Sequence, residues 1–253
     1  MASRSEQKLT RRQRKLAEKG EQKLQRVPTL KQQHFDLMYV EPKTLNQEKV
    51  FGDYKEGYDL FLHGAPGTGK TFLSMYLALN EIMDFKTEKK RLVIIRSAQP
   101  SKQIGFLPGS EKEKLAVYER PYRTAAEKLF GRGDAYDILV QKGLIHFEST
   151  SFLRGNEFED AIVLLEETQN MTYGEIKTCM SRIGDNCRVI INGDGKQDDL
   201  TSARYNEESG LATLKKVLEK MGCVAYTEFG IQDIVRSGFV RSFIEAEYEL
   251  GLC

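Results

Sequence analysis

Short apolar runs alternate with longer amphipathic stretches along most of the chain, from about residue 44 onwards. Several runs are continuously apolar, which is typical of strands buried on both faces of a parallel sheet. Predicted strands lie at 59–63, 91–96, 144–147, 161–165, 188–191 and 224–229. Helical spacing predicts helices at 70–84, 111–129, 172–183, 210–221 and 233–250, with a break or kink at Pro121. This order predicts an α/β fold, an open and mostly parallel sheet flanked by helices.

The first segment of the chain differs from the rest in its charge. Residues 1–26 carry nine basic and three acidic side chains, a net +6, whereas the whole chain is +1. Their large apolar residues are three leucines spaced seven and eight apart, a thin stripe for a helix. We therefore predict a basic, polar arm or helix at 1–43 and one domain at 44–253. The arm is interpreted as a solvated tail, a contact to nucleic-acid phosphates, or a helix that docks on a neighbouring subunit.

The composition excludes several classes of protein. With 253 residues, 40% hydrophobic and 30% charged, the chain is not collagen-like, mucin-like or wholly disordered. Four cysteines without a Cys-x-x-Cys pair do not form a disulfide scaffold or a zinc site. No apolar stretch approaches the roughly 18 residues of a membrane span, and the polar N-terminus does not resemble a secretory signal. We expect a cytoplasmic protein without a membrane partner.

The strongest chemical signal follows the first predicted strand. The sequence GAPGTGKT satisfies G-x-x-x-x-G-K-[ST] and opens a helical pattern, which is the strand–loop–helix context that the motif requires. Glycines let backbone N–H groups surround a phosphate, the helix start favours an anion, and the lysine reaches the terminal phosphates. The threonine hydroxyl is a Mg²⁺ ligand in such loops. The expected phosphate-binding residues are Gly64, Ala65, Pro66, Gly67, Thr68, Gly69, Lys70 and Thr71.

Two further apolar strands end in polar clusters. The run 161–165 is followed by Glu166, which we expect to act on Mg²⁺, and by Glu167, which we expect to polarise the attacking water. The run 188–191 is followed by Asn192 and Asp194, with Gln197 shortly after. Strand carboxyl ends line the ligand crevice in open α/β sheets, so Gln197 or Asn192 is expected to sense the γ-phosphate, oriented by Asp194.

Several motifs in this order resemble the PhoH-like, phosphate-starvation-inducible proteins. They cover the chain from about residue 45 to 248, and the short form is similar to versions carried by bacterial viruses, which would place it in the host cytoplasm. The motifs are the phosphate loop, LEETQN at 165–170, SRIG at 181–184, the GD…Q…DL run at 193–200, DIVR at 233–236, GFLPG at 105–109 and FLRG at 152–155.

The resemblance implies a RecA-like P-loop NTPase core similar to superfamily 1 helicases, with ATP, Mg²⁺ and RNA or single-stranded nucleic acid as ligands. It also implies that a glutamine upstream of the loop, here Gln47, reads adenine. Two positions depart from the family pattern: Glu166 stands in place of Asp and Thr168 in place of Ala. Some relatives carry a fused PIN-type ribonuclease domain. The segment ahead of this core is too short and too basic for one, so we expect no nuclease activity.

A single core is expected to leave the γ-phosphate open on one side. A cation supplied by a neighbouring copy would close it, and a closing heterologous interface gives a ring, so we predict a homo-oligomer, most simply a hexamer. Arg236, within the DIVR motif, is the favoured arginine finger. The other candidates are Arg241, Arg182 and Arg154.

A basic and aromatic cluster surrounds and follows the predicted loop at 97–109, and we interpret it as a contact for a polymer or as a solvated helix face. The function that the residues favour is ATP hydrolysis by Lys70, Glu167, Gln197 and Arg236, coupled to RNA or single-stranded nucleic acid. The alternatives are a non-catalytic nucleotide switch or scaffold and a small-molecule phosphotransferase. The cluster consists of Lys102, Lys112, Lys114, Tyr118, Arg120 and Tyr122.

Overall fold

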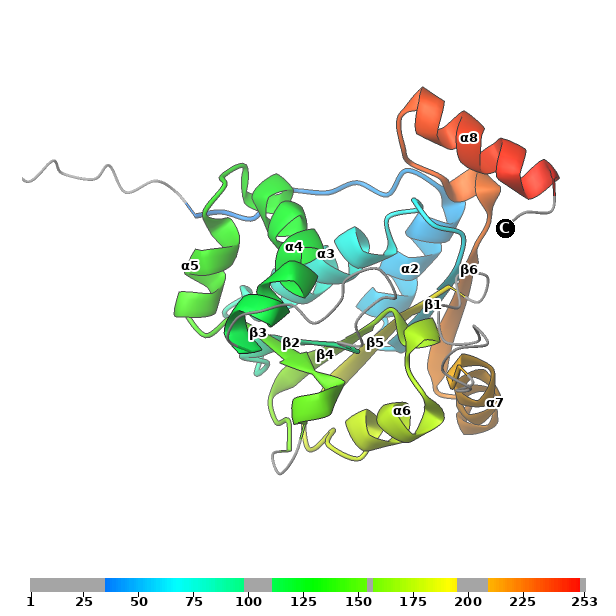
Figure 1. Ribbon diagram of the computed structural model, residues 1–253. Helices are drawn as coiled ribbons and strands as arrows, with labels where there is room; N and C mark the ends of the chain where they lie inside the picture. Colours follow the sequence, from blue (N-terminus) through cyan, green and yellow to red (C-terminus); the bar gives the residue numbers. More distant parts are fainter. Residues whose placement is uncertain (1–34, 98–110, 154–156, 195–208, 251–253) are drawn as a thin grey trace, which may run out of the picture. The chain divides into compact units, whose positions relative to one another are not determined.

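The computed structural model describes residues 35–97, 111–153, 157–194 and 209–250 (Figure 1). The chain divides into two compact units, 1–36 and 37–253. The fold described here is that of the second unit. Most of the predicted basic arm lies outside the described residues, so the arm stays a prediction.

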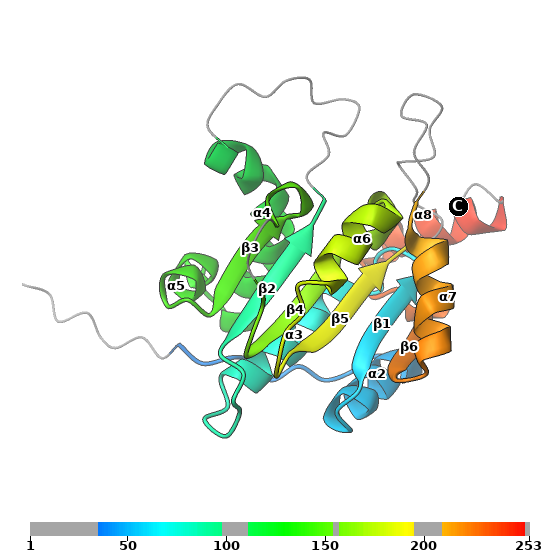
Figure 2. The same ribbon diagram turned by 90° about the horizontal axis from the view of Figure 1, so that it is seen from below.

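One parallel sheet forms the centre of this unit. Its strand order is β3-β2-β4-β5-β1-β6, and every described pairing is parallel, so the arrows of Figure 2 point in one direction. Each strand begins and ends within two residues of its predicted position. The bounds are β1 Asp59–Gly64, β2 Arg91–Arg96, β3 Ile145–Ser149, β4 Ala161–Glu166, β5 Arg188–Gly193 and β6 Val224–Phe229.

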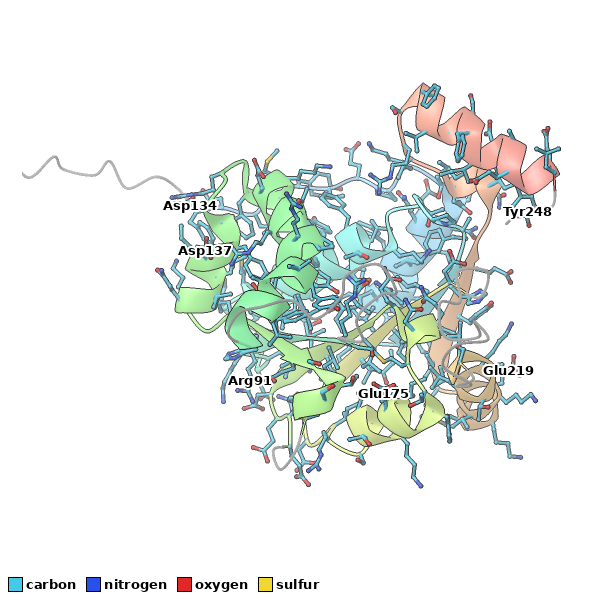
Figure 3. All side chains as sticks on the ribbon, viewed as in Figure 1. Arg91, Asp134, Asp137, Glu175, Glu219 and Tyr248 are labelled. Carbon is cyan, nitrogen blue, oxygen red and sulfur yellow. The ribbon has the colours of Figure 1, made fainter. Side chains whose placement is uncertain are left out.

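Helices cover both faces of the sheet. Figure 1 places α2 to α5 on one face and α6 and α7 on the other. Charged side chains such as Asp134 and Glu219 lie on the outside (Figure 3). The helices are α2 Leu45–Lys55, α3 Lys70–Ile82, α4 Glu111–Phe130, α5 Ala135–Gln141, α6 Tyr173–Met180, α7 Leu211–Met221 and α8 Gly238–Glu249, with 3-10 turns η1 Thr150–Phe152, η2 Thr168–Asn170 and η3 Ile231–Asp233.

The helix predictions needed three corrections. The helices α2 and α5 were not predicted, because α2 buries only three side chains and α5 is two turns long. The helix α4 continues across Pro121, so the predicted break is wrong and the alternative, a kink, stays a prediction; Pro121 is exposed, whereas Tyr122 and Leu129 are buried. The predicted helix at 233–250 begins only at Gly238, since η3 ends at Asp233 and the next residue is extended.

The central strands are buried on both faces, as the continuous apolar runs predicted. Every residue of β4 is buried, with α3 against one face and the cluster that contains Ile176 and Leu214 against the other. The strand β5 lies between β1 and β4, so the loop after β1 and the acidic end of β4 meet at the carboxyl edge of the sheet. The fold is that of a RecA-like P-loop core. Every helix within the described ranges is too short or too polar to cross a membrane.

Candidate functional site

The phosphate loop connects β1 to α3, as the motif predicted. A Cβ on Gly64 would lie 2.2 Å from the carbonyl oxygen of Phe229 on β6, so only glycine permits this approach. Gly67 has φ +76°, in the left-handed region that side chains disfavour. The motif glycines therefore serve two purposes: Gly64 lets the loop pack against β6, and Gly67 lets it turn.

Two segments from distant parts of the chain hold the loop from outside. Gln47 on α2 donates its Nε2 to the Thr68 carbonyl at 3.0 Å. The Val235 N–H donates to the Gly67 carbonyl at 3.1 Å. Within the loop, the Thr68 hydroxyl donates to the Ala65 carbonyl at 3.0 Å. The loop is thus fixed in shape before any ligand binds.

Gln47, predicted from the resemblance to read adenine, is buried behind the loop. Its Oε1 accepts the Lys43 N–H at 2.7 Å, so backbone groups engage both ends of its carboxamide. To contact a base, Gln47 would have to give up one of these bonds. The described contacts stabilise the loop, and adenine recognition stays a prediction.

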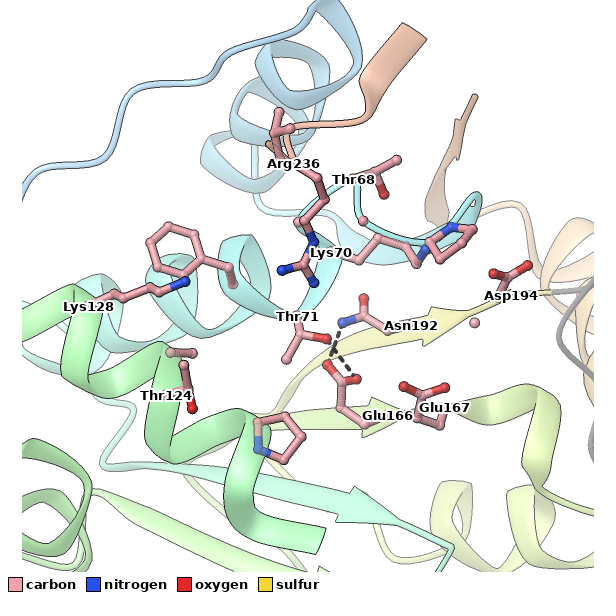
Figure 4. Close-up of a pocket in the computed structure, with 18 of the residues that line it drawn as sticks. Thr68, Lys70, Thr71, Thr124, Lys128, Glu166, Glu167, Asn192, Asp194 and Arg236 are labelled. Carbon is pink, nitrogen blue, oxygen red and sulfur yellow. Dashed lines mark hydrogen bonds between the residues drawn. The ribbon is translucent and has the colours of Figure 1, made fainter. Parts of the chain in front are cut away.

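A cavity of about 620 Å³ opens beside the loop (Figure 4). It brings together the loop residues from Pro66 to Thr71 with Glu166, Glu167, Asn192 and Asp194, whereas Gly64 and Ala65 do not line it. Gln197 lies outside the described residues, and its predicted role stays a prediction. The lining residues are Lys43, Pro66, Gly67, Thr68, Gly69, Lys70, Thr71, Phe72, Pro121, Thr124, Ala125, Lys128, Glu166, Glu167, Gln169, Asn192, Gly193, Asp194, Val235 and Arg236.

Glu166 is a buried carboxylate at the end of β4. One oxygen accepts the Thr71 hydroxyl at 3.0 Å, and the other accepts the Asn192 amide at 2.6 Å. Burial, and next the neighbouring charge of Glu167, raise the pKa of Glu166 to about 7, against the lowering effect of the two hydrogen bonds. Without a cation the carboxylate is therefore strained electrostatically.

The donor set around Glu166 fits a magnesium ion. A carboxylate and a hydroxyl, which are hard oxygen ligands, converge at the start of the helix that follows the phosphate loop. In the described part of the chain, no group of three or more His, Cys, Asp or Glu side chains could hold a metal. A cation at Glu166 and Thr71 would take its other ligands from phosphates and water.

Glu167 follows directly and lines the same cavity. Its backbone is left-handed (φ 55°), an uncommon conformation for a residue with a side chain, and η2 begins immediately after it. Its Oε2 accepts the Gln169 amide at 2.6 Å. The turn thus directs Glu167 into the cavity, beside Glu166.

Thr168, which replaces the usual alanine, has a structural contact. Its hydroxyl donates to the Asn192 carbonyl at 2.9 Å and joins η2 to β5. A Cβ on Gly193 would come within 2.6 Å of this hydroxyl, so the threonine and the glycine fit each other.

Lys70 points back to the loop. Its Nζ donates to the carbonyls of Gly64 at 2.6 Å and Ala65 at 2.9 Å. Burial lowers the pKa of Lys70, while the charges of Asp194, Glu166 and Glu167 raise it. In the described residues the hydrogen-bond partners of this ammonium are carbonyls, which phosphate oxygens could replace.

Arg236 lies in the cavity of its own chain. Its side chain passes over Gly67, where an added Cβ would be 3.0 Å from the Arg236 Cγ, and descends toward Thr71 (Figure 4). We had expected this arginine to reach a nucleotide on a neighbouring copy. The observed position favours contact with a nucleotide on the same chain, because Val235 ties the segment to the loop.

Several lining residues were not predicted as site residues, and three of them carry polar side chains from α4 and η2. Thr124 and Lys128 reach the cavity from α4, and Gln169 from η2. The sequence gives no signal for Lys128, because the chain has many lysines. The packing of α4 beside α3 brings it to the cavity. Gln169 carried a signal, since it lies within the LEETQN motif.

The predicted polymer-binding cluster is only partly brought together. Tyr122 is 1% exposed and cannot stack on a base, which corrects that part of the prediction. A second groove of about 480 Å³ adjoins the cavity, and Arg96, Tyr118 and Arg120 line it together with Pro121 and Thr124. Lys102 lies outside the described residues, as do the side chains of Lys112 and Lys114.

A family model described as PhoH-like protein matches residues 39–249. The chain belongs to the PhoH-like family. The PhoH-like protein of Bacillus subtilis (strain 168) is 33% identical over 205 residues, which cover 81% of this chain and 62% of that protein. Protein PhoH of Escherichia coli (strain K12) is 32% identical over 189 residues, 74% of this chain and 52% of its own length. This PhoH-like chain therefore spans less than two thirds of these relatives.

A solved structure with a similar fold is the large terminase of the thermophilic bacteriophage D6E. Its TM-score is 0.51 and its sequence identity 13%, over 81% of this chain and 50% of the terminase chain. At this identity the likeness concerns the fold alone. Together with the family match, it shows that the PhoH-like domain has a fold of the P-loop type.

Proposed function

We propose that this protein binds ATP with Mg²⁺ and hydrolyses it. The observation that carries the proposal is that the phosphate loop faces Glu166, Glu167 and Arg236 across one cavity. Phosphate binding alone would not require two carboxylates beside it, because their charges repel phosphate. A water-activating base and a metal ligand account for both.

Each residue has a distinct part in the proposed reaction. The loop amides and Lys70 bind the β- and γ-phosphates, and Lys70 leaves its carbonyl partners to do so. Glu167 accepts a proton from the water whose oxygen attacks the γ-phosphorus, while the bond to the β–γ bridging oxygen breaks. Arg236 lies where negative charge increases during this step, and an arginine in such a position contributes roughly 10³- to 10⁵-fold in rate.

Magnesium fits this proposal through Thr71 and Glu166. When bound, it supplies positive charge to the phosphate oxygens. Asn192 would then hold the second oxygen of Glu166 in place, as it does in the described structure. The longer side chain of glutamate, compared with the aspartate of the family, is supported by this amide.

The test compares ATP turnover and ATP binding for the unaltered chain and Glu167→Gln, with and without Mg²⁺. We expect Glu167→Gln to bind ATP normally and to lose at least about 10²-fold in turnover. Normal turnover by this variant would place the base elsewhere. Tight binding without turnover by the unaltered chain would favour a nucleotide switch, and phosphate appearing on an added acceptor would favour a phosphotransferase.

The proposed polymer is RNA or another single strand. The groove beside the cavity supports this, because Arg96 and Arg120 offer charge to phosphates and Tyr118 offers a ring for a base. The groove shares Pro121 and Thr124 with the cavity, so an occupant would lie next to the nucleotide. We expect RNA or single-stranded DNA to stimulate turnover, and Arg120→Glu to remove the stimulation. If the polymer still stimulates turnover of this variant, the polymer binds elsewhere on the protein.

Assembly into a hexameric ring is a separate proposal. Since Arg236 lies in its own cavity, it is no longer the favoured finger for a neighbour. Arg182 follows α6 at the opposite edge of the sheet, and Arg154 lies outside the described residues. Arg241, exposed on α8, is the remaining candidate. Light scattering after size exclusion tests the assembly, and a monomer with full ATP turnover would contradict it.

A further inference from the structure

We propose that Gln169 is a positioning residue that orients the Glu167 carboxylate and connects it to the end of β5. The inference rests on the proposed function, because it takes Glu167 as the base that accepts the proton of water. Gln169 belongs neither to the phosphate loop nor to the proposed metal ligands.

The Gln169 side chain is held at both ends. It is 1% exposed, its Nε2 donates to Glu167 Oε2 at 2.6 Å, and its Oε1 accepts the Asp194 N–H at 3.0 Å. A backbone N–H can only donate and a carboxylate can only accept. The two contacts therefore fix which end of the carboxamide faces which partner, and no flipped orientation satisfies both.

Glu167 depends on such support because of its position. It is the first residue after β4, in a left-handed backbone conformation, and its side chain is only half-buried. A glutamate side chain has three rotatable bonds, which must be fixed for its oxygen to meet a water. The amide of Gln169 occupies one carboxylate oxygen and leaves the other for that water.

The end of β5 holds both carboxylates through different contacts. The Asn192 side chain donates directly to Glu166, and the Asp194 backbone reaches Glu167 through Gln169. A single strand end thus sets the spacing between the proposed metal ligand and the proposed base. Asn192 acts on Glu166 whether or not Gln169 is present, so the two effects are separable by mutation.

A double-mutant cycle tests the inference, using the full chain with ATP and Mg²⁺. We expect Gln169→Ala to lower kcat by about 10- to 100-fold and to change the Kd for ATP by less than about threefold. In the Glu167→Gln background it should lower kcat no further, since Gln169 acts through Glu167. Gln141→Ala, an exposed glutamine at the end of α5, is the matched control and should match the unaltered chain.

A second variant distinguishes a loss of kcat from a loss of folding. Gln169→Met keeps nearly the same side-chain volume and adds no charge beside the two carboxylates, but it removes the donor to Glu167. We expect it to stay folded, judged by thermal unfolding, and to show the same loss of kcat. Such a loss with normal stability would support positioning, because a structural role would be preserved.

Several results would overturn the inference. Normal kcat in both Gln169 variants, a kcat above normal, or an equal loss in the Glu167→Gln background would each do so. If the unaltered chain hydrolyses ATP and Glu167→Gln does not, these results leave the proposed function intact. No turnover by the unaltered chain would overturn both proposals.

Discussion

The two edges of the sheet handle charge in opposite ways. At the amino edge, Glu81 accepts Arg188 at 2.7 Å and the Tyr54 hydroxyl at 2.6 Å, and the Arg188 guanidinium lies over the Tyr54 ring. At the carboxyl edge, Glu166, Glu167 and Lys70 line one cavity, and no ion pair found in the described residues involves any of them.

This difference separates stability from function. Paired charges at the amino edge join α2, α3 and β5 and neutralise one another. At the carboxyl edge, burial and like charge keep Glu166 in an unfavourable state that a phosphate and a cation would relieve. We infer that the carboxyl edge gives up stability so that binding recovers it. The four predictions that follow test this contrast.

The largest effect is expected for Lys70→Ala. Turnover should fall by at least about 10³-fold, roughly 4 kcal/mol in the barrier, since Lys70 is the cation of the loop. Thermal stability should change little, because the cost of burying this charge opposes the favourable effect of the nearby charges of Asp194, Glu166 and Glu167. Lys89→Ala at the amino edge is the control and should leave turnover unchanged. Turnover by Lys70→Ala within tenfold of normal would contradict the contrast.

The next effect concerns pH in a metal-free buffer with a chelator. The pKa of Glu166 is raised to about 7 in the fold, so the folded chain binds this proton more tightly than the unfolded chain. This proton contributes about 3 kcal/mol to the free energy of unfolding. The contribution is fully present below about pH 4.5 and is lost as the pH rises through 7. Urea unfolding at several pH values measures this loss.

Two comparisons isolate the contribution of Glu166. In Glu166→Gln the difference between pH 5 and pH 8 should be smaller by that amount, and saturating Mg²⁺ with ATP should reduce it in the unaltered chain. An identical pH slope in the unaltered chain and the variant would show that Glu166 is not strained.

A smaller effect on stability is expected at the amino edge. Arg188→Ala removes the closer of two charged partners of the partly buried Glu81, leaving Lys89 at 4.0 Å, and should lower the free energy of unfolding by about 2 kcal/mol. Turnover per folded molecule should stay normal. Arg241→Ala breaks an exposed pair with Glu245 and should cost less than about 1 kcal/mol. Equal losses from the two changes would remove the distinction between the edges.

The smallest effect links η2 to β5. Thr168→Ala removes one hydrogen bond and should cost about 1 kcal/mol. Gly193→Ala should cost more, because its Cβ would press on the Thr168 hydroxyl. In the double variant that clash is relieved. The double variant should therefore lose less unfolding free energy than the sum of the two single losses. Strict additivity would show that the two residues do not meet.

The strands and the phosphate loop could be predicted because their signals are local. Continuous apolar runs mark strands buried on both faces, and the loop motif lies within eight residues. The parallel sheet then predicts that the acidic residues after 161–165 lie near the phosphate loop, since the carboxyl ends of parallel strands share an edge. These predictions required no knowledge of side-chain contacts.

What could not be predicted depends on contacts between distant segments. Arg236 was expected to act on a neighbour, because the sequence does not reveal that β6 pairs with β1 and returns the chain to the loop. The contacts of Gln47 with Thr68 and Lys43 were not predicted, whereas its recognition of adenine stays a prediction. Gln169 lies in a recognised motif, yet its partner Asp194 comes 25 residues later.

The attachment of α8 has a practical use. The helix buries none of its side chains, and Ser237 alone separates it from Arg236. Phe239, in the first turn, is 84% exposed. A fluorescent dye at that position would be carried by the segment that touches the phosphate loop, so nucleotide exchange becomes an optical signal that can be followed in real time.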